Sequence, residues 1–479
     1  MSEETAKRLN RRRFIALTGG ALTAAAILAA CGDNTPTSGT VATTAATNAT
    51  TAASAATTAA GAATTAATTA ASATTAAANV APNGIKLVLL NQSRGQAAAL
   101  EALAKTYLAQ TGVEVTINTA GPTDYLQKLQ ASSQSGDMPD MYSALAKYND
   151  MAPYYKAGWA MNLQPEMDKG WSKNFSSSVL KQITWKEGNP QGLQPGIYGA
   201  PWEINTYAVL GNPTIFKKAG LDLSTPPATM PEFIDQLKKI NNSKSAPFLL
   251  ASSNTALFIQ HYVSNFLTDD EISQTFGGKL PWKSDAWRNA LQLIVDLRDA
   301  GAIANNALPT GSSDNATGEK EFFNVQDLAT YYDSAVSISV AKTTAPDFTT
   351  FISFPLPKAG NGKLEPRSVG GFGRGMAINP KGKHPDEALK FIKWMTDPAQ
   401  EKQMFDTVPL LPANPNALDT SKLSPQVTGF SSLVDKTQVI SNPLKAQVNE
   451  AMQKGIQSLV LKEKSVDQVL DDLEAAQRS

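Results

Sequence analysis

The chain of 479 residues has one cysteine and two histidines, and its 42 basic residues balance 42 acidic ones. A single cysteine excludes a disulfide framework, so apolar burial must hold the fold. His261 and His384 lie far apart and lack the spacing of a zinc or iron site, so we expect no metal and no cofactor. The charge balance, without any basic block, predicts no nucleic-acid partner and favours a small, uncharged ligand.

The sequence also lacks the motifs of common catalytic sites: a Gly-x-Ser-x-Gly elbow, a P-loop and the kinase set. Gly370–Gly375 is rich in glycine but precedes the apolar strand Met376–Ile378, whereas a dinucleotide fingerprint opens a helix. Carboxylate pairs such as Asp269 and Asp270 lie in polar, solvated stretches. We therefore expect a protein that is not an enzyme.

The N-terminus has three parts in order: the basic and apolar start Arg11–Ile15, an apolar run of roughly 15 residues, and the small residues before Cys31. This pattern predicts a signal peptide over residues 1–30, because the apolar run is shorter than the about 20 residues that span a membrane. Leu28–Cys31 resembles a bacterial lipoprotein signal. The resemblance implies that Cys31 carries lipid and anchors the protein to a membrane that the chain does not span. Arg11–Ile15 also resembles a twin-arginine signal, and the choice between this route and the general secretory route stays open.

Residues 31–83 are predicted to form a lipidated tether. From Val41 to Ala78 the sequence is almost wholly alanine and threonine, with no charge, aromatic or large aliphatic residue. Such a segment has no large apolar side chains whose burial could offset the conformational entropy lost on folding. It would hold the folded body away from the membrane.

The body starts with an α/β pattern. Ile85–Leu90 is an apolar run of strand length, a helical stripe follows up to Gly112, and Val113–Ile117 alternates as a second strand. A strand, helix and strand in this order predict two parallel strands with a right-handed crossover. Further on, Thr229–Glu232 and Ser465–Gln468 have the spacing of helix capping boxes.

Aromatic and amide side chains are dense in Tyr198–Tyr207. Aromatic rings such as Trp202 and Tyr207 cover the apolar face of a sugar, and the neighbouring Glu203 and Asn205 can satisfy its hydroxyl groups. Alternate members of this strand could equally be packed in the core. From these residues alone, the two interpretations stay open.

Several segments, in order, carry a family resemblance. They are Asn91–Arg94, Gly136–Asp140, Ile197–Pro201, Asn212–Gly220, Pro226–Phe233, Ser368–Pro380 and His384–Pro398. Over nearly all of residues 84–479, the chain resembles the family 1 extracellular solute-binding proteins, the sugar-binding lipoproteins of ATP-driven (ABC) importers, with a maltose-binding-protein-like layout. The ordered set carries the resemblance, and no single segment does.

The resemblance implies an α/β, two-lobe periplasmic-binding-protein fold with three inter-lobe crossings, near Ala200, Tyr332 and Phe372. Lobe 1 would hold residues 84–200 plus 330–372, and lobe 2 residues 201–329 plus 373–479. The ligand would bind in the cleft at the crossings, with hinge closure around it. Asp140 and Trp394 are interpreted as structural residues.

Position by position, the resemblance implies a ligand site at five places along the chain: after the first strand, after Asp140, and at the three crossings. The residues are Gln92, Ser93, Arg94, Tyr142, Lys147, Trp202, Glu203, Asn205, Tyr207, Asp333, Ser334, Phe372 and Arg374. The chain departs from the family pattern at Gln326–Asp327, at Ser334–Val336 and at Gly211, so an aromatic platform of the family is lost. A small saccharide therefore fits better than a long maltodextrin.

The resulting hypothesis is an extracytoplasmic, membrane-anchored and monomeric protein that captures a small carbohydrate and delivers it to ABC permease subunits. One alternative is a binding protein for a polyol, a polyamine or a peptide. The other is a secreted glycan-processing enzyme, which needs two facing carboxylates with one pKa raised.

Overall fold

The computed structural model describes residues 80–479 except 146–147, 190, 244, 252–253 and 304–314. The predictions for the signal peptide, Cys31 and the Ala/Thr tract lie outside the described residues. Within them, no helix has the length and apolar character needed to cross a membrane.

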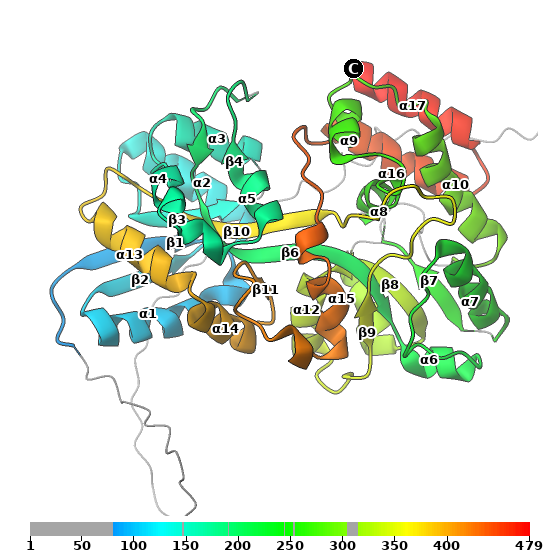
Figure 1. Cartoon of the computed structure of the whole chain (residues 1–479), viewed down its shortest axis with the longest axis horizontal. Coiled ribbons are helices and arrows are strands. Elements are labelled where there is room, and N and C mark those ends of the chain that lie inside the picture. The colour runs from blue at the N-terminus through cyan, green and yellow to red at the C-terminus, as the bar shows by residue number, and fades with distance from the viewer. Residues whose placement is uncertain (1–79, 146–147, 190, 244, 252–253, 304–314) are drawn as a thin grey trace, which may run out of the picture. The chain divides into compact units, whose positions relative to one another are not determined.

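Within the described residues, nine strands form one sheet in the order β2-β1-β3-β10-β6-β8-β7, with β9 and β11 also paired to β6 (Figure 1). The strands are β1 Lys86–Asn91, β2 Glu114–Thr119, β3 Met141–Leu145, β6 Ala200–Gly211, β7 Ala246–Leu249, β8 Leu328–Ser334, β9 Ile352–Phe354, β10 Gly370–Ile378 and β11 Leu411–Pro412. β4 Thr184–Trp185 and β5 Gly196–Ile197 form a separate pair.

Helices cover the sheet. They are α1 Ala97–Thr111, α2 Pro122–Ser135, α3 Tyr148–Lys156, α4 Gln164–Asp168, α5 Ser177–Ile183, α6 Pro213–Lys218, α7 Met230–Asn242, α8 Thr255–Val263, α9 Asp269–Phe276, α10 Asp285–Asp299, α11 Asn315–Glu319, α12 Val336–Thr344, α13 Pro385–Met395, α14 Pro398–Thr407, α15 Pro425–Ser431, α16 Ala446–Val460 and α17 Val466–Arg478.

The first predicted unit is confirmed. β1 and β2 pair in parallel, and α1 connects them. Gly112 ends α1 with a φ of 76°, the left-handed conformation that glycine adopts without strain. The helix buries Leu100 and Leu103 against the sheet, as the apolar stripe predicts.

Both predicted caps are present. The Ser465 side chain accepts a hydrogen bond from the backbone of Gln468, which caps Ser465 in return, so α17 begins with a complete capping box. Thr229 caps α7 in the same way, but the Glu232 carboxylate reaches Ala228 instead of Thr229.

The packing differs from the expected division into lobes. The Tyr107 ring of α1 lies 5.0 Å from the rings of both Phe391 and Trp394 on α13, so α13 packs with the N-terminal elements. β8 pairs with β7 and with the second half of β6. Residues 330–354 therefore pack with the segment 201–300, whereas the prediction placed them in the lobe of the N-terminal strands. Residues 385–407 pack with α1, whereas the prediction placed them in the other lobe. The resemblance gave the order of the segments but not the partner of each.

β6 connects the two groups of elements. Its first half pairs with β10 and its second half with β8, over twelve residues without a break. The buried apolar side chains of the protein form two hydrophobic clusters, and β6 contributes to both. Ile204 belongs to one cluster and Val209 to the other. β6 therefore contributes to the core of both groups of elements.

Candidate functional site

Polar side chains meet at one edge of the sheet. β1 and β3 are parallel, so their carboxyl ends lie at the same edge, and Gln92 directly follows β1. Arg374 of β10 pairs with Leu145, the last residue of β3, and Glu203 of β6 pairs with Arg374. Residues from four strands thus converge at the carboxyl edge, where open α/β sheets bind ligands.

The side chains at this edge form a hydrogen-bonded network. The Arg374 Nε donates to Gln92 Oε1 at 3.0 Å, and its Nη1 donates to Glu203 Oε1 at 2.9 Å and to Oε2 at 2.8 Å. Gln96 Nε2 donates to Glu203 Oε2 at 2.6 Å. Gln92, Glu203 and Arg374, predicted as site residues from three distant parts of the sequence, are in direct contact.

The network balances a buried charge. The Glu203 side chain is 4% exposed, and a carboxylate in such a place is costly unless a cation and hydrogen bonds compensate it. Arg374 supplies the cation and keeps 26% of its own side chain exposed. The edge therefore presents donors and acceptors without a net charge, which suits an uncharged polar ligand.

Gln96 was not among the predicted site residues. It is fully buried, and its Oε1 has no hydrogen-bond partner among the described residues. Its position one residue before α1 and four after Gln92 gave no pattern that a sequence search could use. Only the fold brings it to Glu203.

A second polar group lies further along β6. Ser334 pairs with Tyr207, and Asp333 with Ala208. The Asn254 side chain donates to Asp333 Oδ1 at 3.3 Å, and the Ser334 backbone donates to the same oxygen at 2.7 Å. The Tyr207 ring stacks on Tyr332 with 5.8 Å between centroids. Asn254 was also missed by the sequence analysis.

Burial governs the titration of this second group. Asp333 is 1% exposed, and burial raises its pKa to about 7. Burial also raises the pKa of Tyr207 well above its usual value, with the Asp333 carboxylate as the second cause. The raised pKa places the proton exchange of Asp333 near neutral pH.

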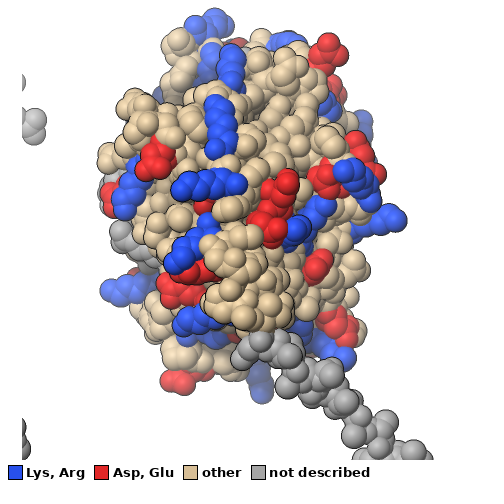
Figure 2. Space-filling view, turned by 90° about the vertical axis from the view of Figure 1, so that its left-hand side faces the viewer, with Lys and Arg blue, Asp and Glu red and all other residues tan. Residues whose placement is uncertain are grey.

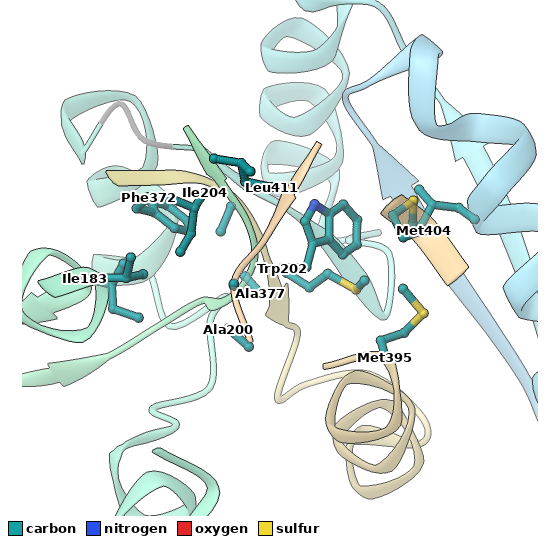
Figure 3. Packing of buried hydrophobic residues seen from close by; sticks show 14 of the residues in the cluster. Ile183, Ala200, Trp202, Ile204, Phe372, Ala377, Met395, Met404 and Leu411 are labelled. Atoms are coloured by element: carbon teal, nitrogen blue, oxygen red, sulfur yellow. The ribbon is translucent and has the colours of Figure 1, made fainter. Parts of the chain in front are cut away.

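The alternation of β6 separates the four residues predicted on it. Glu203, Asn205 and Tyr207 point to one face of the strand, and Trp202 points to the other. Figure 3 shows Trp202 beside Leu411, Met404 and Met395. Trp202 is 4% exposed, which fits the core alternative. The other face of β6, with Glu203, Asn205 and Tyr207, remains the candidate for ligand contact.

Other predicted site residues also lie in the core. Tyr142 is fully buried, and its hydroxyl donates to the Trp159 carbonyl at 3.1 Å. Phe372 is 7% exposed and lies near Ile204 (Figure 3). Ser93 is partly buried, and its backbone N–H donates to Asn91 Oδ1 at 3.1 Å, which fixes the loop after β1. The Arg94 side chain and Lys147 lie outside the described residues.

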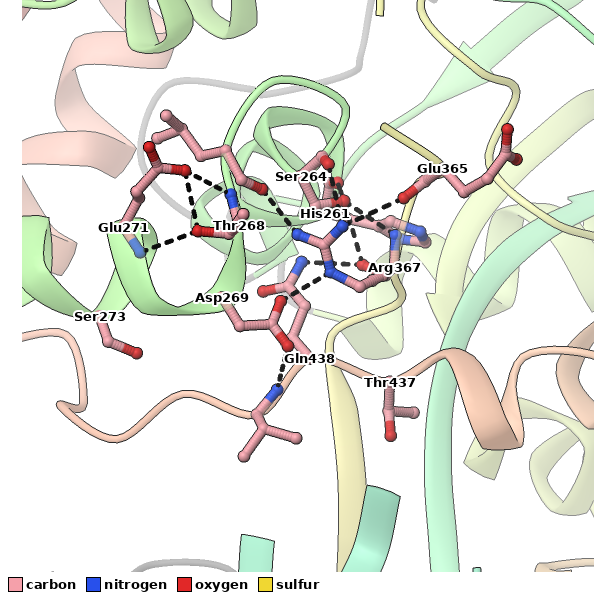
Figure 4. A network of polar contacts seen from close by, with 12 residues as sticks. His261, Ser264, Thr268, Asp269, Glu271, Ser273, Glu365, Arg367, Thr437 and Gln438 are labelled. Atoms are coloured by element: carbon pink, nitrogen blue, oxygen red, sulfur yellow. Dashed lines mark hydrogen bonds and ion pairs between the residues drawn. The ribbon is translucent and has the colours of Figure 1, made fainter. Parts of the chain in front are cut away.

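A further network fixes the segment that leads into β10 (Figure 4). Arg367 Nε donates to Asp269 Oδ1 at 2.7 Å, and Asp269 Oδ2 accepts from the Val439 backbone at 2.8 Å. Gln438 Nε2 donates to the Arg367 carbonyl at 2.8 Å. These bonds hold two chain segments against α8 and α9, and so they position the start of β10 and, through it, Arg374.

The histidines do not form a metal site. His261 is fully buried in α8, with Nδ1 3.0 Å from the Tyr332 hydroxyl, and burial lowers its pKa to about 3. His384 precedes α13. In the described part of the chain, no three His, Cys, Asp or Glu side chains gather as metal ligands would.

The sheet and its covering helices define an α/β protein with a polar group at the carboxyl edge of its strands. The chain belongs to the family described as "Bacterial extracellular solute-binding protein", which residues 102–429 match. This result confirms the resemblance inferred from the ordered segments, and the α/β periplasmic-binding-protein fold is confirmed with it, whereas the number of inter-lobe crossings stays a prediction.

The relatives agree with this assignment. The chain is 22% identical over 331 residues to a multiple sugar-binding protein of Streptococcus mutans, covering 67% of this chain and 73% of that protein. A probable secreted solute-binding lipoprotein from Streptomyces coelicolor has a similar structure, with a TM-score of 0.69, 18% identity and coverage of 82% and 98%. So does a cyclic alpha-maltosyl-1,6-maltose binding protein from Arthrobacter globiformis, with a TM-score of 0.65, 20% identity and coverage of 82% and 97%.

Proposed function

We propose that this protein captures a small carbohydrate and delivers it to an ABC importer, as an extracytoplasmic lipoprotein anchored through Cys31. The network of Gln92, Arg374 and Glu203 carries the proposal, because it offers an uncharged set of donors and acceptors at the ligand-binding edge of the sheet. The family and its sugar-binding relatives support it. We propose that the protein acts as a monomer, with permease subunits as its partners.

Within this proposal, Tyr207, Asn205 and the group around Asp333 and Ser334 form the second part of the site. Asn205 has a buried Oδ1 without a partner among the described residues, and it lies on β6 between Glu203 and Tyr207. A ligand hydroxyl is a suitable donor for this oxygen. The Tyr207 ring is the stacking surface that we propose in place of Trp202.

The enzyme alternative fits less well. Glu203 is neutralised by Arg374, and Asp333 pairs with Ala208, five residues further along β6. At about 3.3 Å per residue, the two backbone positions are about 17 Å apart along the strand. Glycoside hydrolysis uses carboxyl groups about 5–9.5 Å apart.

Thermal-shift screening of the purified protein against mono- and oligosaccharides, polyols, polyamines and short peptides tests the proposal. Binding to the folded state raises the melting temperature by mass action. A neutral sugar should raise it, and Arg374→Met should abolish the rise. If only polyamines or peptides raised the melting temperature, the ligand would belong to that class and not to the carbohydrates. Release of cleaved sugar would show that the protein is an enzyme.

A further inference from the structure

A groove of about 1180 Å³ is lined by alternate residues of β1, by the end of β2, by α2 and by the segment that leads into β3. Val88 and Ile117 line its floor, and Trp159 lines one wall. None of these residues belongs to the candidate carbohydrate site. The groove is therefore a separate surface of the same group of strands.

Lysines surround this groove. We define the lysine groove by Lys86, Lys128, Lys381 and Lys383, all of which line it. Among the described residues, only the first of them has a carboxylate partner, Glu114 at 2.9 Å. Figure 2 views the body from the side on which β1 begins, and Lys and Arg side chains form a row there with fewer Asp and Glu among them.

Two acidic residues, Asp137 and Asp140, also line the groove and offset only part of the charge of its four lysines. Asp140 Oδ2 accepts a hydrogen bond from the Val88 backbone at 2.9 Å. Asp137 is exposed. Lys381 Nζ lies 3.9 Å from the centroid of the Trp159 ring and donates to the Ala157 carbonyl, so it is held in place without a counter-charge. The groove therefore has an excess of positive charge, although the whole chain is neutral.

The chain enters the folded body beside this groove. The backbone of Val80 donates to the Ala109 carbonyl, and that of Asn83 donates to the Gly112 carbonyl, so both residues lie against the end of α1. Lys86 begins β1 three residues later. The part of the sequence that holds Cys31 thus joins the body next to Lys86, the first lysine of the groove.

We propose that the lysine groove docks on an anionic lipid surface and binds the phosphates of its headgroups. This inference rests on the membrane anchoring within the proposed function. Each lysine near an anionic membrane contributes about 1 kcal/mol of binding, and the attraction reaches about one Debye length, so a protein kept near the membrane by a tether would gain from it.

Vesicle co-sedimentation of the full chain tests the proposal. All proteins carry Cys31→Ser, so that no lipid is attached, and phosphatidylcholine vesicles with and without phosphatidylglycerol are compared. The test protein also carries Lys128→Gln, Lys381→Gln and Lys383→Gln. Its matched control carries Lys218→Gln, Lys238→Gln and Lys239→Gln, three exposed lysines of α6 and α7. Binding that needs phosphatidylglycerol should fall about tenfold or more in the test protein only.

Equal loss in both proteins, or no dependence on phosphatidylglycerol, would overturn the proposal and leave an acidic protein partner as the remaining occupant. Sugar-induced thermal shifts are measured on the same samples. They should be unchanged, because the lysine groove is separate from Glu203. An absent sugar response with normal vesicle binding would refute the proposed function and not this inference.

Discussion

Arg374 brings to the edge of the sheet the positive charge that Glu203 requires. Removing one partner of a buried pair leaves the other charge uncompensated, which costs about 3–5 kcal/mol, whereas removing both costs much less. We expect Arg374→Met to lower the free energy of unfolding by about 3 kcal/mol, and Glu203→Gln to restore part of that loss when added to it. Urea unfolding of the two single variants and the double variant measures this coupling. Additive losses would mean that the pair contributes no coupling.

Trp202 is expected to contribute to folding more than to ligand binding. Its ring is 4% exposed and lies among Leu411, Met404 and Met395, and truncating such a side chain costs about 3–5 kcal/mol. Trp202→Ala should therefore lower the melting temperature strongly, while Trp202→Phe should lower it less. Calorimetric titration with the sugar found by screening supplies the second readout. A large loss of affinity in a stable Trp202→Phe protein would return this ring to the ligand site.

Asp333 should make the stability depend on pH. Its folded pKa of about 7 lies above the ordinary value of 3.8, so the folded protein holds the proton more tightly than the unfolded chain. The stabilisation is complete below about pH 4 and is lost as the pH rises through 7. Asp333→Asn should remove this dependence, which is on the order of a few kcal/mol. Unfolding curves of both proteins between pH 5 and pH 8 would contradict this expectation if their difference stayed constant.

Some residues of the candidate site could be predicted from the sequence, and others could not. Gln92, Glu203 and Arg374 could be predicted because each follows or lies on an apolar strand of a familiar order of segments. Gln96 and Asn254 could not, because nothing in their neighbourhood marks them and only the pairing of β1, β6 and β8 brings them to the acidic side chains. Trp202 could not be placed from the sequence, because the composition of a segment does not reveal which alternate residues face the core.

At the scale of elements, the ends of the helices were the best predicted features. A capping box or a left-handed glycine acts over four residues, so the sequence contains the whole interaction. The partners of β8 and α13 were predicted in reverse, because pairing between segments far apart depends on surfaces that no local pattern describes. The network of Arg367, Asp269 and Gln438 is of the same long-range kind.

The cap of α17 gives a direct test at this scale. Ser465→Ala removes the side chain that accepts from the Gln468 backbone, and such a loss costs about 1 kcal/mol. The free energy of unfolding from urea denaturation should fall by that amount. Ser479→Ala, at the exposed end of the same helix, is the matched control and should change nothing. Equal effects of the two substitutions would argue against the cap.

For the whole molecule, the tether prediction can be separated from the fold. Residues 41–78 contain no charge and no large apolar side chain, and such a segment buries little. Deleting them should leave the melting temperature within about a degree. Differential scanning calorimetry of the full chain and of the deletion checks this. A drop of many degrees would show that the segment packs on the body.

The continuity of β6 has a consequence for the size of the ligand. Glu203 and Tyr207 lie on the same face of one strand, four residues apart, and this strand has residues in both hydrophobic clusters. Their backbone positions are therefore about 13 Å apart. In the proposed site, a single sugar ring would reach one of the two polar groups, and a chain of sugar units would span both. The spacing of these residues on β6 would then set the length of ligand that the site can hold. Each added sugar unit should increase the affinity until the ligand contacts both polar groups, and further units should not increase it.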